Sequence, residues 1–197
     1  MGTRGSAELR DEEASRAGEI LGLTARKNLA LRDGFFEQDE ASLLKVIAAV
    51  RTYQPEVVLA PAITDRHPDH GRGSRLVRDA CFMAGLSKIE TTDSHGNKQD
   101  HWRPKRVFFY IQDYSLQPDF VVDITGFWEK KKEAILAFGS QFFNPGFDGE
   151  ETYISNRDYL DFLEARVRNM GHIIGATFGE GFMSETALAI NSPLDLI

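Results

Sequence analysis

The stretch T-D-R-H-P-D-H-G, residues 64–71, holds two histidines, two aspartates and an arginine within eight residues. It follows an apolar, β-branched run, residues 57–61, of the kind found in strands buried inside parallel sheets. Ligands of open α/β sheets bind beyond the carboxyl ends of the strands, so a functional site is expected here. Pro68 suits the first turn of a following helix. His67 and His70 would then lie three residues apart, close enough for both rings to reach one cavity.

These residue types suit a metal ion. A neutral imidazole binds zinc, and a nearby carboxylate such as that of Asp69 can fix which ring nitrogen faces the ion. A single histidine in a loop is usually just solvated, but two histidines with two aspartates after a buried strand favour a functional site. A catalytic zinc, however, takes three protein ligands and an open position. Two other histidines, His95 and His101, lie in a polar loop, and His172 lies near the end of a late helix. Solvated or structural roles are expected for all three. Residue spacing alone therefore supports two histidines of a metal site but does not identify the remaining ligand.

The elements that must position this cluster alternate along the chain. Helices are predicted over residues 6–21, 39–54, 74–84, 127–138 and 156–170, and strands over residues 28–31, 56–61, 106–111, 120–124 and 178–183. Strands that alternate with helices of about 10–15 residues indicate βαβ units. The sequence therefore predicts an α/β sandwich with a largely parallel sheet.

Size and composition exclude several classes of protein. The 197 residues fit one domain, residues 1–197, with the 42% hydrophobic and 27% charged content of an ordinary globular protein. No apolar run approaches the ~18–20 residues of a membrane span and no signal peptide opens the chain, so a cytoplasmic protein without membrane contacts is expected. The net charge of −7 argues against a nucleic-acid partner. Cys81, the one cysteine, excludes an internal disulfide and is expected to be an inert core thiol.

Further motifs accompany the histidine cluster. His67-Pro68-Asp69-His70-Gly71, preceded by Asp65-Arg66, resembles the second signature of the LmbE-like (PIG-L) zinc N-deacetylases. Other matching motifs are G-T-R-G at 2–5, R-D-E-E at 10–13, L-R-D-G-F-F at 31–36, W-R-P-K at 102–105, P-D-F-V-V-D-I at 118–124 and S-Q-F at 140–142. Together they run along essentially the whole chain and most closely resemble the bacillithiol-biosynthesis branch, the N-acetylglucosaminyl-malate deacetylases. The resemblance implies a Rossmann-like three-layer sandwich and a homo-oligomer.

The resemblance also implies an activity, the hydrolysis of the N-acetyl group of a small amino-sugar conjugate by zinc-activated water. By position, His70 would be a Zn²⁺ ligand, although imidazole and carboxylate also suit other divalent transition metals. His67 would stabilise the oxyanion of the tetrahedral intermediate, with Asp69 holding its ring. Arg4 and Asp33 align with substrate-contacting positions, and Arg66 would line the same cavity.

One part of the family pattern is missing from the sequence. The first signature, A-H-P-D-D, supplies two zinc ligands and the general base, but no such string occurs in the 197 residues. The first strand-helix-strand of the family is missing with it, and the chain as it stands is expected to be inactive. Truncation is the favoured explanation. The alternatives are a degenerate, non-catalytic binding or assembly subunit, and an unrelated metal hydrolase that recruits Asp33 or Asp65 as an extra ligand.

Overall fold

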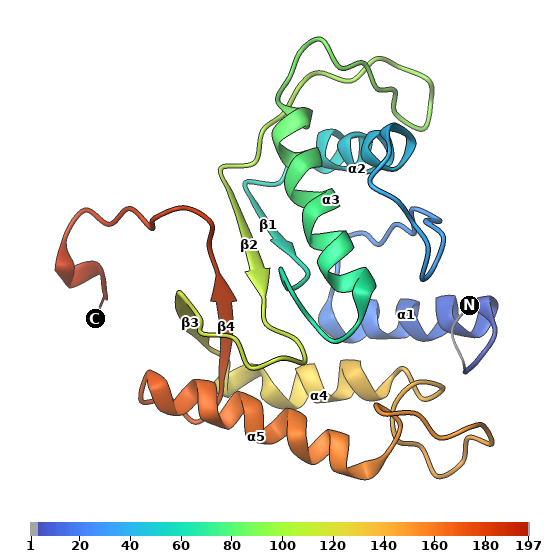
Figure 1. Cartoon of the computed structure of the whole chain (residues 1–197), viewed down its shortest axis with the longest axis vertical. Helices are drawn as coiled ribbons and strands as arrows, with labels where there is room; N and C mark the ends of the chain where they lie inside the picture. The colour runs from blue at the N-terminus through green and yellow to red at the C-terminus, as the bar shows by residue number, and fades with distance from the viewer. Residues whose placement is uncertain (1–3, 197) are drawn as a thin grey trace. The chain divides into compact units, whose positions relative to one another are not determined.

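The computed structural model describes residues 4–196, which form an α/β structure (Figure 1). The helices are α1 Ala7–Leu21, α2 Glu40–Tyr53, α3 Pro68–Ala84, α4 Trp128–Leu136 and α5 Arg157–Ile173, with short 3-10 helices η1 Thr125–Phe127 and η2 Pro193–Leu196. The strands are β1 Val57–Ala60, β2 Arg106–Tyr110, β3 Phe120–Asp123 and β4 Gly179–Met183. The chain divides into two compact units: residues up to 33 with 121–180, and residues 34–120 with those from 181 onwards. The single domain over residues 1–197 stays a prediction.

The predicted fold class is confirmed, and the sheet proves to be mixed. Its strand order is β1-β2-β4-β3. β1 and β2 are parallel, with Val57 opposite Arg106, and α3 lies in the crossover between them. β4 runs antiparallel to β2, with Phe109 opposite Met183. The carboxyl ends of β1 and β2 therefore lie at one edge of the sheet, and the loops that follow them emerge side by side.

In the first unit, local signals fix the bounds of α1. The Ser6 side chain accepts a hydrogen bond from the Leu9 N–H at 3.2 Å, and Gly22, at φ 75°, ends the helix as the sequence predicted. Buried alanines join α1 to α4 and its C-cap residue, namely Ala17, Ala134 and Ala137. A second cluster joins the α4 and α5 region through Ile124, Trp128 and Val167.

The strand predicted over residues 28–31 is wrong, because the structure shows no regular element there. The Asn28 side chain accepts a hydrogen bond from the Ala30 N–H at 2.9 Å, which forms an Asx turn. Ala30 takes a φ of 49°, a left-handed conformation that a strand cannot accommodate. A short apolar run therefore looked like a strand, but the asparagine before it turns the chain.

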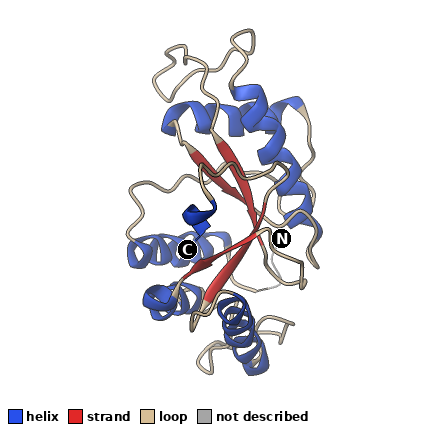
Figure 2. Cartoon of the chain, turned by 90° about the vertical axis from the view of Figure 1, so that its left-hand side faces the viewer, coloured by secondary structure: helices blue, strands red, loops and turns tan. Residues whose placement is uncertain are grey.

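In the second unit, α2 and α3 pack together, and α3 lies against β1 and β2 (Figure 2). Leu76 and Ala80 of α3 are buried in this core with Ile47 of α2. The helix predicted from residue 74 starts earlier, at Pro68, with His67 as its N-cap. Its first turn thus begins inside the histidine cluster. None of the helices in the described part of the chain combines the length and apolar character that a membrane span requires.

Candidate functional site

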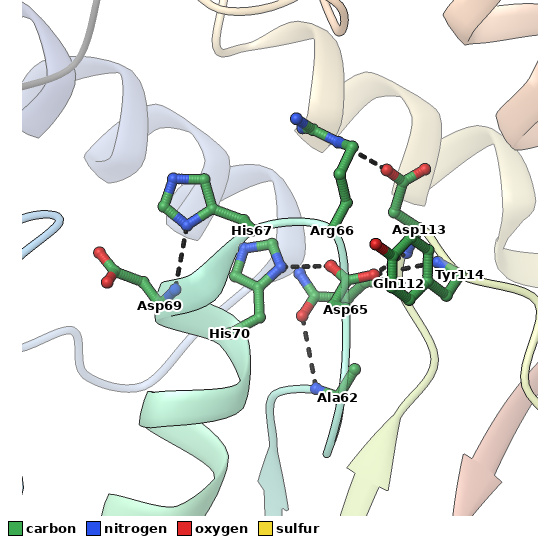
Figure 3. A network of polar contacts seen from close by, with 9 residues as sticks. All are labelled: Ala62, Asp65, Arg66, His67, Asp69, His70, Gln112, Asp113 and Tyr114. Carbon is green, nitrogen blue, oxygen red and sulfur yellow. Dashed lines mark hydrogen bonds and ion pairs between the residues drawn. The ribbon is translucent and has the colours of Figure 1, made fainter.

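The histidine cluster lies in the second unit and spans the loop after β1 and the first turn of α3 (Figure 3). Asp65 connects this loop to the one that follows β2. Its Oδ1 accepts hydrogen bonds from the backbone N–H groups of Asp113 at 2.9 Å and Tyr114 at 3.0 Å. Its Oδ2 lies 2.5 Å from Nδ1 of His70. Because β1 and β2 are parallel neighbours, a single carboxylate can reach both loops.

The ionisation of Asp65 settles the direction of its bond to His70. The Asp65 side chain is 1% exposed, and burial opposes its charge. The hydrogen bonds from His70 and from the backbone of Tyr114 and Asp113 prevail and lower the pKa of Asp65 below its usual value. A carboxylate only accepts hydrogen bonds, so His70 donates its Nδ1–H. In a neutral ring this leaves the lone pair on Nε2, the state in which an imidazole binds a metal.

His67 has the opposite hydrogen-bonding state. It is the N-cap of α3, and its Nδ1 accepts a hydrogen bond from the Asp69 N–H at 3.2 Å. A neutral ring that accepts at Nδ1 carries its proton on Nε2. The two ring centroids are 5.3 Å apart (Figure 3). The site therefore presents a hydrogen-bond donor on one imidazole beside a potential metal ligand on the other.

Asp69 meets His67 through its backbone, whereas the resemblance implied that its carboxylate would hold the ring. The carboxylate points away from both imidazoles (Figure 3) and accepts a hydrogen bond from the Gly34 N–H at 2.7 Å. Arg72 lies 3.1 Å from the other carboxylate oxygen and donates to the Gly34 carbonyl at 2.8 Å. Gly34 has a φ of 74°, where a side chain would strain the backbone. The Asp69 side chain thus fixes the turn at residue 34.

Arg66 and Asp113 form an ion pair that sequence reasoning did not foresee. The Arg66 Nε donates to Asp113 Oδ2 at 2.7 Å, and the Arg66 side chain is 42% exposed. Gln112, just before Asp113, accepts a weak hydrogen bond from the Ala62 N–H at 3.4 Å. A signal for these residues existed, because polar side chains follow β2 within a few residues of its end, just as the histidine cluster follows β1.

Arg4 and Asp33, the other predicted substrate residues, belong to the first unit. Arg4 is 7% exposed, and its guanidinium stacks 4.7 Å above the centre of the Phe147 ring. Its carbonyl accepts a hydrogen bond from Gln141 Nε2 at 2.8 Å. Its buried Nε finds no acceptor among the residues that the structure describes. Arg4 therefore keeps an unused donor on a cation whose position is fixed by its neighbours. Asp33 lies where the first stretch of this unit ends.

The donor set fits a metal only in part. Within residues 4–196, no group of three or more histidine, cysteine, aspartate or glutamate side chains could hold a metal ion. Within that range, only His70 has the required chemistry, since its imidazole is fixed by a carboxylate at Nδ1, which leaves Nε2 for a metal ion. The two oxygens of Asp65 already accept hydrogen bonds from His70 and from the loop after β2, which argues against Asp65 as an extra ligand.

Histidines and carboxylates beyond the carboxyl ends of two parallel strands define an α/β protein with an enzyme-like site at the sheet edge. The sequence model of the PIG-L family, described as GlcNAc-PI de-N-acetylase, matches residues 1–81. A conserved protein of Thermus thermophilus is 33% identical and superposes with a TM-score of 0.82, over 97% of this chain and 80% of that one. The chain belongs to the PIG-L family, as its motifs indicated.

Two curated proteins that are similar to this chain differ in activity, one being a deacetylase and the other a hydratase. Diacetylchitobiose deacetylase of Thermococcus kodakarensis is 28% identical over 73% of this chain and 53% of its own length. 4-Oxalmesaconate hydratase of Pseudomonas putida is 27% identical over 68% of this chain and 51% of its own length. The chain thus spans about half the length of the curated relatives that it matches.

Proposed function

We propose that this chain forms part of a metal-dependent N-deacetylase that acts on an N-acetylglucosaminyl conjugate. Membership of the PIG-L family and the similarity to a diacetylchitobiose deacetylase support a deacetylase in general. The observation that carries the proposal is the pairing of two adjacent imidazoles in opposite hydrogen-bonding states. His70 offers a lone pair and His67 offers an N–H, which are the two functions that metal-assisted amide hydrolysis needs side by side.

His70 would hold the metal, with zinc the first candidate, through Nε2. When bound, such an ion lowers the pKa of a coordinated water and so supplies a nucleophile near neutral pH. His67 would donate its Nε2–H to the acetamide oxygen as negative charge develops there. One donor in such a position is worth about 2.7–4 kcal/mol of transition-state stabilisation. Asp69 contributes its backbone N–H, which fixes the His67 ring with the proton on the side that serves this role.

The substrate would be held by arginine and carboxylate side chains. Arg4 has a buried guanidinium with an unused Nε donor, which suits the carboxylate of an aglycone such as malate. Asp33 would accept hydrogen bonds from sugar hydroxyls. Arg66 is half-exposed in the loop after β1 and would bind a further polar group of the substrate. The bacillithiol precursor N-acetylglucosaminyl-malate is therefore the proposed substrate.

The experiment is an assay of amine release by the product of the natural gene, including any coding sequence that precedes the Met1 codon. N-acetylglucosaminyl-malate and N,N′-diacetylchitobiose would be compared, with added zinc and with a chelator. We expect metal-dependent release from both, with the larger kcat/KM for the malate conjugate. The deacetylase proposal is refuted if neither substrate releases amine, and the malate assignment alone fails if diacetylchitobiose is preferred.

A hydratase is the second candidate, favoured by the similarity to 4-oxalmesaconate hydratase. A hydratase adds activated water across a carbon–carbon double bond, so the same pair of histidines could serve it. The two candidates separate in one experiment, since only the deacetylase releases a primary amine and acetate. Absorbance loss from 4-oxalmesaconate, without amine release from either sugar, would select the hydratase.

A cytoplasmic location and a homo-oligomeric assembly complete the proposal, with a small amino-sugar conjugate as the partner molecule. Neither nucleic acid nor a membrane is proposed as a partner, given the net charge of −7. Light scattering on the purified protein measures the oligomeric state, and a monomer at micromolar concentration would contradict this part of the proposal.

A further inference from the structure

We propose that Asp65 is the positioning residue of this site, which sets the tautomer of His70 and holds the loop after β2 in register with it. The inference rests on the proposed function, in which His70 faces a metal. It concerns a residue that neither binds substrate nor coordinates the metal in that proposal. Its basis is the set of hydrogen bonds that converge on one buried carboxylate.

The geometry gives each Asp65 oxygen a separate task. Oδ1 accepts from two consecutive backbone N–H groups, those of Asp113 and Tyr114, across 48 and 49 positions of sequence. Oδ2 accepts from His70 Nδ1 at 2.5 Å. Both tasks require an acceptor, and only a carboxylate offers two acceptor oxygens in this arrangement. With the Asp65 side chain 1% exposed, water has little access to replace either bond.

The same loop carries the partner of Arg66. The backbone N–H of Asp113 donates a hydrogen bond to Asp65. The Asp113 carboxylate accepts a hydrogen bond from the Arg66 Nε–H at 2.7 Å. Asp65 thus acts on two parts of the site. It fixes the proposed metal-binding ring of His70 directly, and it positions Arg66 through Asp113. Loss of Asp65 should disturb both, whereas loss of the Asp113 carboxylate should disturb only Arg66.

Asparagine at position 65 provides a sharp test, because it keeps the shape but replaces one acceptor oxygen with an NH₂ donor. The backbone N–H groups can only donate, so the amide oxygen must stay on Asp113 and Tyr114 while the NH₂ turns to His70. His70 then has to accept at Nδ1, and its proton moves to Nε2. Asp65→Asn is therefore expected to reverse the tautomer of His70 and remove the lone pair from Nε2.

The experiment is nitrogen-15 NMR of the imidazole rings in the metal-free protein, at a pH shown by titration to leave both rings neutral. The wild type should show His70 protonated at Nδ1 and His67 protonated at Nε2. Asp65→Asn should show His70 protonated at Nε2, while the matched control Asp113→Asn keeps the wild-type pattern at both rings. The backbone amides of Asp113 and Tyr114 should exchange their hydrogens more slowly than unprotected amides do. This should hold in the wild type and in Asp65→Asn, because the acceptor oxygen remains in both.

A wild-type His70 protonated at Nε2, or an Asp65→Asn variant that keeps the Nδ1 proton, would overturn the inference. Should Asp65→Asn fail to give the amide spectrum of a folded protein, the wild-type ring spectrum still decides between the two tautomers. A titration with Zn²⁺ alone tests the proposed function separately from the role of Asp65. The expected result is a shift of the His70 Nε2 signal, with about 10–100-fold weaker binding in Asp65→Asn. The expected tautomers without any Zn²⁺ effect would support the role of Asp65 and count against His70 as a ligand.

Discussion

The rings of His67 and His70 lie 5.3 Å apart, yet each makes a different hydrogen bond through Nδ1. This difference should separate their roles in a kinetic experiment on the product of the natural gene. His70→Ala should lower metal content and activity together, because it removes a ligand. His67→Ala should keep its metal while kcat falls by roughly 10²–10³, the scale for removal of one donor to an oxyanion. His101→Ala, an exposed histidine outside the cluster, is the control.

Metal analysis and steady-state kinetics on the three variants provide the measurement. Equal metal loss in His67→Ala and His70→Ala would show that both rings are ligands and that the roles are assigned wrongly.

Arg4 offers a prediction about substrate choice. Arg4→Lys keeps the charge but loses the planar fork that can bind a carboxylate with two parallel hydrogen bonds. It should raise KM for N-acetylglucosaminyl-malate more than for plain N-acetylglucosamine and affect kcat less. Asp33→Asn should lower kcat/KM equally for both substrates, because both carry the same sugar hydroxyls. An equal loss on both sugars in Arg4→Lys would remove the support for malate.

The single cysteine gives a residue-scale test of the core. Cys81 lies in α3 and is 3% exposed, and burial raises the pKa of its thiol to about 11. The thiolate is the reactive form, so at pH 8 its population should be on the order of 100-fold below that of an ordinary cysteine. A thiol reagent at pH 8 should therefore react slowly with the native protein and rapidly in denaturant. Fast modification of the native protein would mean that α3 opens or packs differently.

At the scale of elements, a buried carboxylate joins α1 to the chain that follows α4. Glu13 is 4% exposed and accepts hydrogen bonds from the Ser140 N–H at 2.6 Å and the Ser140 Oγ–H at 2.7 Å. Gly5 fits closely against Ser140, since a Cβ at Gly5 would lie 2.8 Å from its Oγ. Gln141 bonds both Ser140 and the Arg4 carbonyl at 2.8 Å. These contacts hold Arg4 in place.

Glu13→Ala should lower the free energy of unfolding by at least about 2 kcal/mol, because each buried donor left without an acceptor costs about 1–3 kcal/mol. The neighbouring Glu12 is exposed, so Glu12→Ala should change the same quantity by less than about 0.5 kcal/mol. Urea denaturation of both variants measures the difference. Similar values for the two would mean that the Glu13–Ser140 bonds contribute little to stability.

For the whole molecule, the prediction concerns the 197 residues as they stand. A catalytic zinc takes three protein ligands, and the described residues contain no group of that size. We expect this chain, purified alone, to release no amine above background from N-acetylglucosaminyl-malate with or without zinc. Metal-dependent turnover would instead favour an unrelated hydrolase that finds its ligands within these residues. The reading frame upstream of the Met1 codon, if it encodes a strand followed by A-H-P-D-D, would explain an inactive fragment.

Much of the fold could be predicted from the sequence because its signals are local. Ser6 and Gly22 bound α1 through contacts within a few residues, and Pro68 starts α3 by its fixed φ. The alternation of strands and helices likewise predicted the α/β class, and family motifs identified the PIG-L relationship. The histidine cluster was placed after β1 on the same grounds. The strand over residues 28–31 failed because one Asx turn outweighs a short apolar run.

The sequence by itself determined which residues could do chemistry, the helices that flank them and the edge of the sheet where they lie. Only the tertiary structure decided the partners of those residues. Asp65 meets residues 48 and 49 positions away because β1 and β2 are parallel neighbours, a pairing that no local pattern encodes. The antiparallel placement of β4 is of the same kind. The tautomers of His67 and His70 follow from these partners, since the hydrogen bond at Nδ1 decides whether Nε2 carries a proton or a lone pair.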